Sequence, residues 1–351
     1  MDTSILKVNE ETLTDKELLP AIEVLRQGGL VAFPTETVYG LGADALDEDA
    51  AKKIYAAKGR PSDNPLIVHI ADIESLQELA VDVPKVAYDL AREFWPGPLT
   101  IILKKSDKVP YGTTGGLDTV AIRMPNNKLA LELIKQSGLY LAAPSANSSG
   151  KPSPTLASHV VHDLNGKIDM VVDGGKAVLG LESTIVDLTN EKPCILRPGY
   201  ITKDMLERIV GEVQYDGVVL LKALDPTIKP KAPGMKYKHY APSGDMSIIE
   251  GEVQDVVDYI NKEIDHAISE GRSVGVIATE ETKHLYHAGL VKSIGSRNND
   301  ETIAASLYAI LREFDELKTE VIFSESFYDE KLGQAIMNRL VKASGYKVIQ
   351  V

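Results

Sequence analysis

Four basic side chains stand where predicted helices or strands end. Lys58 and Arg60 follow the predicted helix 48–57. Arg123 and Arg197 each end a predicted strand, just before a turn that contains proline. A single cation at such a position usually favours the helix dipole or is solvated. Four of them beside hydroxyl-rich loops indicate a pocket for a polyanion, because arginine forks and a lysine point charge suit a triphosphate.

Neutral donors lie in the loops that accompany these cations. They are the hydroxyls of Ser145, Ser153 and Ser183 and the side-chain amide of Asn147. His69 lies in an apolar strand, where a histidine is normally a packed core residue. It gains a functional role only if it faces the same cleft as Thr35.

The stretch 31–45, VAFPTETVYGLGADA, is the one around which the chain is organised. A short apolar strand, 31–33, ends at Pro34, which has no backbone donor. Hydroxyls and a carboxylate follow at once, and then Gly40 and Gly42 allow either a close backbone approach or a positive φ. A capped tight turn is the simpler interpretation, but a strand that ends in polar groups also presents a ligand site at a sheet edge.

Several common catalytic motifs are missing from the sequence. It contains no GxxxxGK[ST] loop, no HExxH and no GxSxG elbow. The seven histidines show no metal spacing, and the single Cys194 excludes an internal disulfide framework or a multi-cysteine zinc site. We therefore expect no catalytic triad, and no zinc, flavin or haem.

Composition limits the class of protein. The chain has 351 residues, 44% hydrophobic and 25% charged, which is ordinary for a globular protein of two domains. Its net charge of −13 argues against nucleic-acid binding as the main role of the protein. The N-terminus lacks the features of a signal peptide and no apolar run is long enough for a membrane helix, so we expect a cytoplasmic protein.

The periodicity predicts an α/β chain with three parts. Residues 1–210 are expected to form a twisted mixed sheet with helices, and 242–351 a smaller, parallel, doubly wound domain. Residues 211–241, rich in proline and lysine, are expected to be a linker that packs on something, because Tyr237 and its neighbours are too large for a plain spacer. In the first part the expected helices are 15–28, 48–57, 72–80, 84–94 and 127–137, and the expected strands are 31–33, 66–70, 99–103, 119–124, 139–143, 170–172, 183–188 and 194–196. In the last part, strands 247–249, 274–278, 321–323 and 346–349 alternate with helices 252–270, 300–314 and 331–343.

A set of motifs in fixed order closely resembles the long, two-domain form of the YrdC-type threonylcarbamoyl-AMP synthases. They are PTETVYGLG (34–42), KGRPSDNPL (58–66), WPGPLT (95–100), VAIRMP (120–125), APSAN (143–147), ESTI (182–185), LRPG (196–199) and PGMKYKHYAP (233–242). The resemblance spans nearly the whole chain. It implies a YrdC-like first domain with a positively lined cleft and a Rossmann-like second domain. The implied reaction joins L-threonine, bicarbonate or CO2, and ATP into threonylcarbamoyl-AMP with release of pyrophosphate, the first step of a tRNA modification.

The resemblance also implies roles for individual residues. Around L-threonine it places Thr35, His69, Arg123, Ala143 and Ser183. Around ATP it places Lys58, Arg60, Asn64, Thr119, Ser145, Asn147, Ser153 and Arg197, with Tyr237 as a lid residue from the linker. Mg²⁺ is expected on the phosphates, with no protein ligand that can be named. A separate transferase, and through it tRNA, are the expected downstream partners, and no membrane is expected.

Two alternatives remain beside this interpretation. The first is an RNA-binding or ribosome-associated factor without catalysis, against which the net charge argues. The second is the hydrogenase-maturation carbamoyltransferase, which contains a similar module. That enzyme needs cysteine-rich zinc segments and a further domain before the module, for which one cysteine and a motif that begins at Pro34 leave no room.

Overall fold

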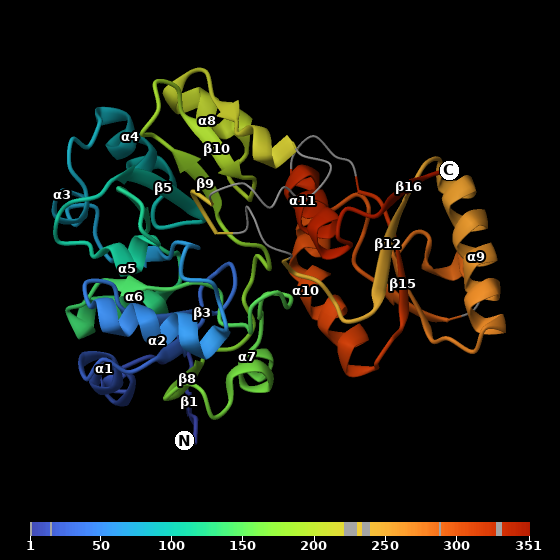
Figure 1. Ribbon diagram of the computed structural model, residues 1–351, viewed down its shortest axis with the longest axis horizontal. Helices are drawn as coiled ribbons and strands as arrows, with labels where there is room; N and C mark the ends of the chain where they lie inside the picture. Colours follow the sequence, from blue (N-terminus) through green and yellow to red (C-terminus); the bar gives the residue numbers. More distant parts are fainter. Residues whose placement is uncertain (1, 15, 221–229, 234–238, 288, 328–331) are drawn as a thin grey trace.

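The computed structural model describes residues 2–14, 16–220, 230–233, 239–287, 289–327 and 332–351. Within these ranges the chain forms two sheets, one of eleven strands and one of five (Figure 1). The first is mixed, and the second is parallel throughout. The expected α/β class, a twisted mixed sheet followed by a smaller parallel one, is confirmed.

The larger sheet runs in the order β1-β8-β2-β3-β7-β4-β6-β5-β9-β10-β11. Because β11 pairs with β10, this sheet reaches Tyr215. Its strands are β1 (Ser4–Lys7), β2 (Val31–Phe33), β3 (Gly40–Asp44), β4 (Ile67–His69), β5 (Leu99–Lys104), β6 (Thr119–Arg123), β7 (Leu141–Ala142), β8 (Met170–Asp173), β9 (Thr184–Asp187), β10 (Cys194–Arg197) and β11 (Gln214–Tyr215). The helices that accompany it are α1 (Leu19–Arg26), α2 (Glu48–Lys58), α3 (Leu76–Leu79), α4 (Lys85–Phe94), α5 (Tyr111–Thr114), α6 (Lys128–Ser137), α7 (Ala157–Leu164) and α8 (Lys203–Val210), followed by the 3-10 helix η1 (Gly217–Leu220).

Strand β3 corrects one expectation about the first motif. The segment after Pro34 was expected to be a glycine-containing loop, but Gly40–Asp44 pairs antiparallel with β2. A Cβ at Gly42 would lie 2.6 Å from the Phe33 ring. Gly42 is therefore required for close packing inside the sheet, and neither glycine of this strand has a positive φ.

Helix α2 ends in a way that places two cations together. Asp47 caps its start by accepting from the Asp49 N–H at 2.8 Å. Gly59 ends the helix in the left-handed conformation, with φ of 61°. The chain turns back there, and the Arg60 N–H donates to the Tyr55 carbonyl at 2.9 Å. Lys58 and Arg60 thus lie immediately before and after the residue at which the chain turns.

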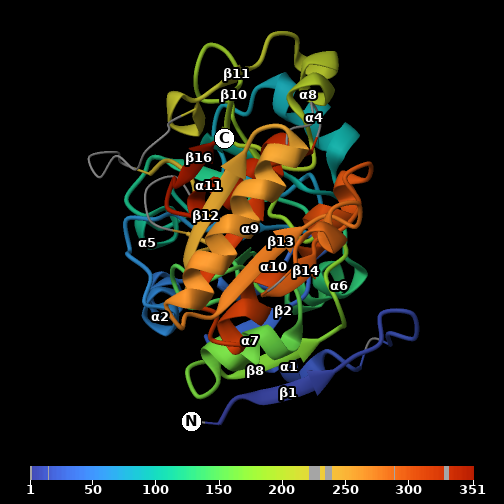
Figure 2. The same ribbon diagram turned by 90° about the vertical axis from the view of Figure 1, so that its right-hand side faces the viewer.

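The smaller sheet runs in the order β14-β13-β15-β12-β16. Its strands are β12 (Asp245–Glu250), β13 (Val274–Ala278), β14 (Leu290–Ser293), β15 (Val321–Glu325) and β16 (Val348–Gln350). Helix α9 (Val253–Ser269) covers its outer face, whereas α10 (Asp300–Glu316) and α11 (Gly333–Ala343) lie between the two sheets (Figures 1 and 2). The short helix η2 (Lys283–Leu285) follows β13. Helices on both faces confirm the doubly wound arrangement.

The two halves share a hydrophobic core. Val38 and Leu181 of the first half and Tyr240 of the linker pack in one cluster with Leu307 and Tyr308 of α10. Gly180 allows α10 to come close, since a Cβ there would lie 2.4 Å from the Ala304 carbonyl oxygen. None of the helices in the described ranges is both long and apolar enough to span a bilayer.

Candidate functional site

A cavity of about 700 Å³, counting the space at its open mouth, lies between the strand ends of the larger sheet and the end of the linker. Its described lining residues lie between Thr35 and Tyr240. Five of them are cations and one, Glu182, is a carboxylate. Several are deeply buried, with exposed fractions of 3% for Lys58, 4% for Arg123 and 5% for Arg197. Glu36 pairs with Arg123, and Asp163 with Lys151, from outside the lining. The wall still holds more cations than carboxylates, and burying cations without matching anions is unfavourable. This composition therefore favours a negatively charged ligand.

Backbone carbonyls fix two of the cations in place. The Lys58 ammonium donates to the carbonyl of Ser145 and, at 2.5 Å, to that of Asn147. Arg60 donates through Nε to the Asn64 carbonyl at 3.3 Å and through Nη2 to the Pro65 carbonyl at 3.1 Å. A charge held by neutral carbonyls keeps its position and its positive field.

Burial, and to a smaller extent the charge of neighbouring arginines, weakens the affinity of these two groups for protons. The pKa of Lys58 falls well below its usual value, chiefly because of burial and then because of Arg60. Burial lowers the pKa of Arg60 to about 10. An anionic ligand would relieve both effects by supplying the opposite charge.

His69 and Arg123 are neighbours across paired strands. They are register partners at the ends of β4 and β6. Arg123 donates through Nη1 to the Thr37 hydroxyl at 2.9 Å and through Nε to the Gly97 carbonyl at 3.3 Å. Burial, and secondarily the charge of Arg123, lowers the pKa of His69 to about 3. His69 is therefore a neutral side chain at physiological pH, in the same cavity as Thr35.

Arg197 is hydrogen-bonded to Ser183, the residue that immediately precedes β9. It donates through Nε to the Ser183 carbonyl at 3.0 Å and through Nη2 to the Ser183 hydroxyl at 3.1 Å. That hydroxyl also shares a hydrogen bond of 2.7 Å with Thr100. Ser183 is fully buried and lies behind Arg197 rather than on the cavity wall.

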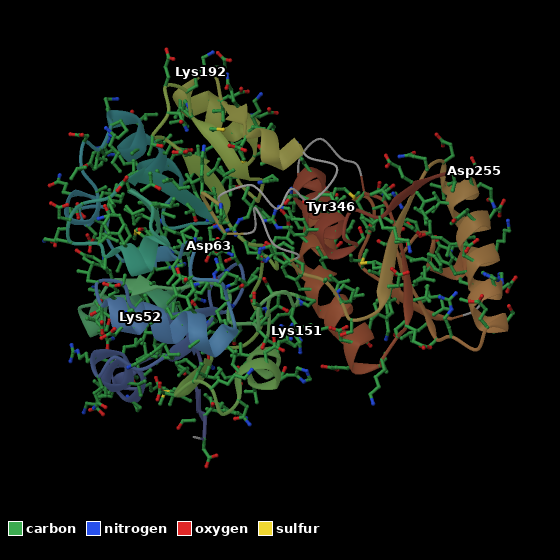
Figure 3. The ribbon with its side chains drawn as sticks, in the orientation of Figure 1. Lys52, Asp63, Lys151, Lys192, Asp255 and Tyr346 are labelled. Atoms are coloured by element: carbon green, nitrogen blue, oxygen red, sulfur yellow. The ribbon has the colours of Figure 1, made fainter. Side chains whose placement is uncertain are left out.

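The loop from Ser145 to Ser153 forms another side of the cavity. The Ser145 hydroxyl donates to the Asn147 side chain at 2.6 Å, and the Asn147 amide donates to the Lys151 carbonyl at 3.0 Å. Lys151 lies where this loop faces the second half of the chain (Figure 3). The Ser153 hydroxyl does not line the cavity, and it donates to Glu182 at 2.6 Å. The loop thus closes on itself and is anchored at its far end by a carboxylate.

The structure brings most of the sequence-predicted site residues together. The nine that line the cavity are Thr35, Lys58, Arg60, His69, Arg123, Ala143, Ser145, Asn147 and Arg197. Asn64, Ser153 and Ser183 lie one hydrogen bond behind it, on Arg60, Glu182 and Arg197. Thr119 is at the opposite end of β6 from Arg123 and is not among the described lining residues. Tyr237 lies outside the described residues.

Sequence reasoning missed several residues of the cavity wall. Glu182 stands in the ESTI motif and Tyr240 in the KHYAP motif, but neither was singled out. Thr37, Lys151 and His239 also line the cavity. The sequence did hold a signal for Glu182. It is the one charged residue of the ESTI motif, and a carboxylate that is buried there needs a cationic or hydrogen-bonding partner.

The described part of the chain holds no carboxylate cluster suited to Mg²⁺. Among the described residues, no group of three or more His, Cys, Asp or Glu side chains is placed to hold a metal. The carboxylate of Glu182 is engaged by Ser153, Tyr308 and Arg339. We therefore assign no protein ligand to Mg²⁺.

Two family models match adjoining parts of the chain. The Sua5, YciO and YrdC domain model, described as "Telomere recombination", matches residues 23–199. The model described as "Threonylcarbamoyl-AMP synthase, C-terminal domain" matches residues 201–345.

Curated relatives match over nearly the full length. The threonylcarbamoyl-AMP synthase of Bacillus subtilis is 52% identical over 97% of each chain. That of Pyrococcus abyssi is 48% identical over 99% of this chain and 100% of its own. The crystal structure of P. abyssi Sua5 complexed with L-threonine superposes with a TM-score of 0.93 at 48% identity, over 99% of this chain and all of that one. A shorter relative, the synthase of Pseudomonas aeruginosa (strain UCBPP-PA14), is 35% identical over 51% of this chain and 95% of its own.

The fold and the cation-lined cavity define a two-domain, ATP-using enzyme of the nucleotidyl-transfer type. The chain belongs to the threonylcarbamoyl-AMP synthase family. Its reaction makes threonylcarbamoyl-AMP, the first step of threonylcarbamoyladenosine formation in tRNA. A non-catalytic RNA-binding factor is not favoured, because the relatives that match the full length are synthases.

Proposed function

We propose that this cavity holds ATP and L-threonine side by side, with the basic residues around the nucleotide and the end of β6 around the amino acid. The observation that supports this most directly is the excess of cations over carboxylates on its wall. We also propose that bicarbonate or CO2 is the third substrate and that Mg²⁺ arrives as part of the Mg–ATP substrate.

On the nucleotide side, Lys58, Arg60 and Arg197 provide the charges for the phosphates. All three are already fixed by backbone carbonyls. Ser145 and Asn147 add neutral polar groups from the adjoining loop, Ser153 supports that loop from behind the wall through Glu182, and Asn64 supports Arg60. Thr119 and Tyr237 remain predicted contacts of ATP.

On the amino-acid side, Arg123 provides a guanidinium for the substrate carboxylate, a pairing that is normally bidentate. Thr35 and neutral His69 line the same part of the cavity, with Ala143 beside them. Ser183 remains a predicted contact of L-threonine, and it lies behind the wall, bonded to Thr100 and to Arg197. The relative from P. abyssi was crystallised with L-threonine, which supports this substrate for the present chain.

The chemistry needs positioning and charge neutralisation rather than a protein nucleophile. The threonine amine attacks the carbon of CO2 and loses a proton, which gives a carbamate. A carbamate oxygen then bonds to the α-phosphorus of ATP while the bond to the pyrophosphate oxygen breaks. Negative charge spreads over the phosphate oxygens as pyrophosphate leaves. Lys58, Arg60 and Arg197 stabilise that charge, as basic groups do in phosphoryl transfer generally.

A pyrophosphate-release assay with the purified chain tests this placement. We expect release only when ATP, L-threonine and bicarbonate are all present, with AMP found in the threonylcarbamoyl adduct. Release that is independent of threonine would contradict the proposed arrangement. Tight RNA binding without any release would restore the RNA-binding alternative.

A further inference from the structure

Glu182 is part of the cavity wall, yet its carboxylate is held by two side chains of the second domain. The Tyr308 hydroxyl lies 3.0 and 2.8 Å from its two oxygens, and Arg339 donates to it through Nε at 3.0 Å. Arg339 also donates to the carbonyls of Pro198, at 2.6 Å, and of Glu182 itself, at 3.3 Å. Both side chains from the second domain are fully buried.

The same carboxylate holds Ser153, at the end of the loop proposed to face ATP. The Ser153 hydroxyl donates to Glu182 at 2.6 Å. Tyr308 and Arg339 are therefore connected to the loop from Ser145 to Ser153 through one residue, Glu182. Neither of them lines the cavity itself. Burial raises the pKa of the Glu182 carboxyl, but Arg339, Arg197 and Ser153 outweigh that effect and hold this pKa at about 2. The carboxylate is thus a permanent acceptor.

A second contact from helix α10 supports the same loop. Arg312 lies one helical turn after Tyr308, so the two side chains share a face of α10. Arg312 donates to the Pro152 carbonyl at 2.5 Å and to the Asp163 carboxylate at 2.9 Å. Asp163 in turn accepts from the Ser148 N–H at 3.1 Å. One face of α10 therefore supports the loop at Ser148, near its middle, and at Pro152, near its end.

Tyr308 also supports the linker side of the cavity. Its ring packs against that of Tyr240, with 5.3 Å between centroids and 30° between planes. Tyr240 lines the cavity, so this tyrosine of α10 contacts two wall residues.

We propose that Tyr308 and Arg339 are positioning residues, which act through Glu182 on Ser153 and so on the nucleotide side of the cavity. This role rests on the proposed placement of ATP. It gives the second domain a part in substrate binding, beyond closing the hydrophobic core between the domains.

The chain offers a matched control for a purely structural role. Tyr286 is also buried and donates to a buried carboxylate, Glu325, at 2.8 Å, and that carboxylate is also paired with an arginine, Arg297. This second cluster lies within the smaller domain and shares no residue with the cavity wall. Tyr286→Phe therefore removes the same kind of hydrogen bond at a distance from the site.

The test compares Tyr308→Phe with Tyr286→Phe in the full-length chain, by KM, kcat and urea unfolding. For Tyr308→Phe we expect the KM for ATP to rise about fivefold to tenfold, the size of effect that one ordinary hydrogen bond has. The KM for L-threonine and kcat should stay within about twofold, and Tyr286→Phe should change neither KM. Equal KM values for ATP in Tyr308→Phe and the wild type would overturn the positioning role.

A double-mutant cycle tests the route through Ser153. If Tyr308 acts on ATP through Ser153, then Tyr308→Phe should add almost nothing in a Ser153→Ala background. Additive effects would overturn that route. A wild-type KM for ATP in Ser153→Ala would likewise overturn that route, whereas a wild-type KM in Arg60→Ala would overturn the proposed placement of ATP. A raised KM in both Arg60→Ala and Ser153→Ala beside a wild-type KM in Tyr308→Phe would overturn the positioning role alone. Arg339→Lys, which keeps the charge, should retain more ATP affinity than Arg339→Met at equal folding.

Discussion

Glu36 Oε2 lies 2.7 Å from Arg123 Nη2, in an ion pair whose members are 9% and 5% exposed. The angles at this contact are not those of a hydrogen bond, and neither Glu36 oxygen has a hydrogen-bond partner among the described residues. Arg123 is therefore neutralised by a carboxylate that has little else to hold it. This arrangement suits a guanidinium that must also accept the carboxylate of an amino acid.

Glu36→Gln tests whether Arg123 is a receptor for that carboxylate. Removing one member of a buried pair leaves the other charge uncompensated, so the free energy of unfolding should fall by about 3 kcal/mol. Saturating L-threonine supplies the missing charge and should stabilise the variant more than the wild type. Urea unfolding with and without L-threonine measures both effects. The exposed pair Lys52–Asp49 is the control, and Asp49→Asn should leave the urea-unfolding curve essentially unchanged. Equal stabilisation of Glu36→Gln and wild type by threonine would contradict this role of Arg123.

Lys58 and Lys53 form a matched pair on helix α2. Both ammonium groups donate to backbone carbonyls, but Lys53 is exposed and binds Gly28, away from the cavity. Lys58→Met should lower the rate of pyrophosphate release about 100-fold or more, because it removes a fixed charge from the leaving phosphates. Lys53→Met should leave the rate within about twofold. Similar losses in both variants would show that Lys58 acts only on the stability of α2.

The buried His69 should make the protein sensitive to acid. The pKa of His69 is lowered from 6.5 to about 3 in the folded chain. Below pH 6.5, His69 is therefore protonated in the unfolded chain but stays neutral in the folded chain. Between about pH 6 and pH 4, this group alone should lower the free energy of unfolding by about 1.4 kcal/mol per pH unit. His69→Asn should remove that contribution to the slope. Parallel curves of unfolding free energy against pH for wild type and variant would contradict a neutral, buried histidine.

Ending the chain near residue 215 should greatly lower activity. Such a chain would lose Tyr308, Arg339 and the linker, so Glu182 would be left with only Ser153 as a side-chain partner among those described. The shorter relative from P. aeruginosa shows that the first half can occur alone in this family. We therefore expect a folded chain with a raised KM for ATP, measured by pyrophosphate release and far-UV circular dichroism. Full activity of the shortened chain would mean that the second domain contributes nothing to ATP binding or to the reaction.

Regular periodicity made much of the fold predictable. The predicted strand 274–278 coincides with β13, and the helix predicted at 48–57 is α2, one residue longer. Strand β3 was missed because glycines carry little strand propensity, and only the position of the Phe33 ring explains Gly42. Short elements such as β14 (Leu290–Ser293), whose four residues are half-buried, had too weak a pattern to be found.

The candidate site was predictable to the extent that its residues belong to motifs. Lys58, Arg60, Arg123 and Arg197 converge on one cavity, as their positions at element ends suggested. The roles of Ser153 and Ser183 as supports behind the wall were not predictable, because they depend on which way a buried hydroxyl points. The network of Glu182 depends on side chains 126 and 157 positions further along the chain, and local periodicity carries no information about such pairs.

That separation has a consequence during synthesis on the ribosome. Glu182 is translated long before Arg339, which lies 157 positions later. Until helix α11 has emerged, the nascent first domain carries an anionic side chain without its cationic counterpart. If Tyr308 and Arg339 position the nucleotide side of the cavity as proposed, a half-made chain binds ATP more weakly than the finished enzyme and reaches full affinity only late in translation.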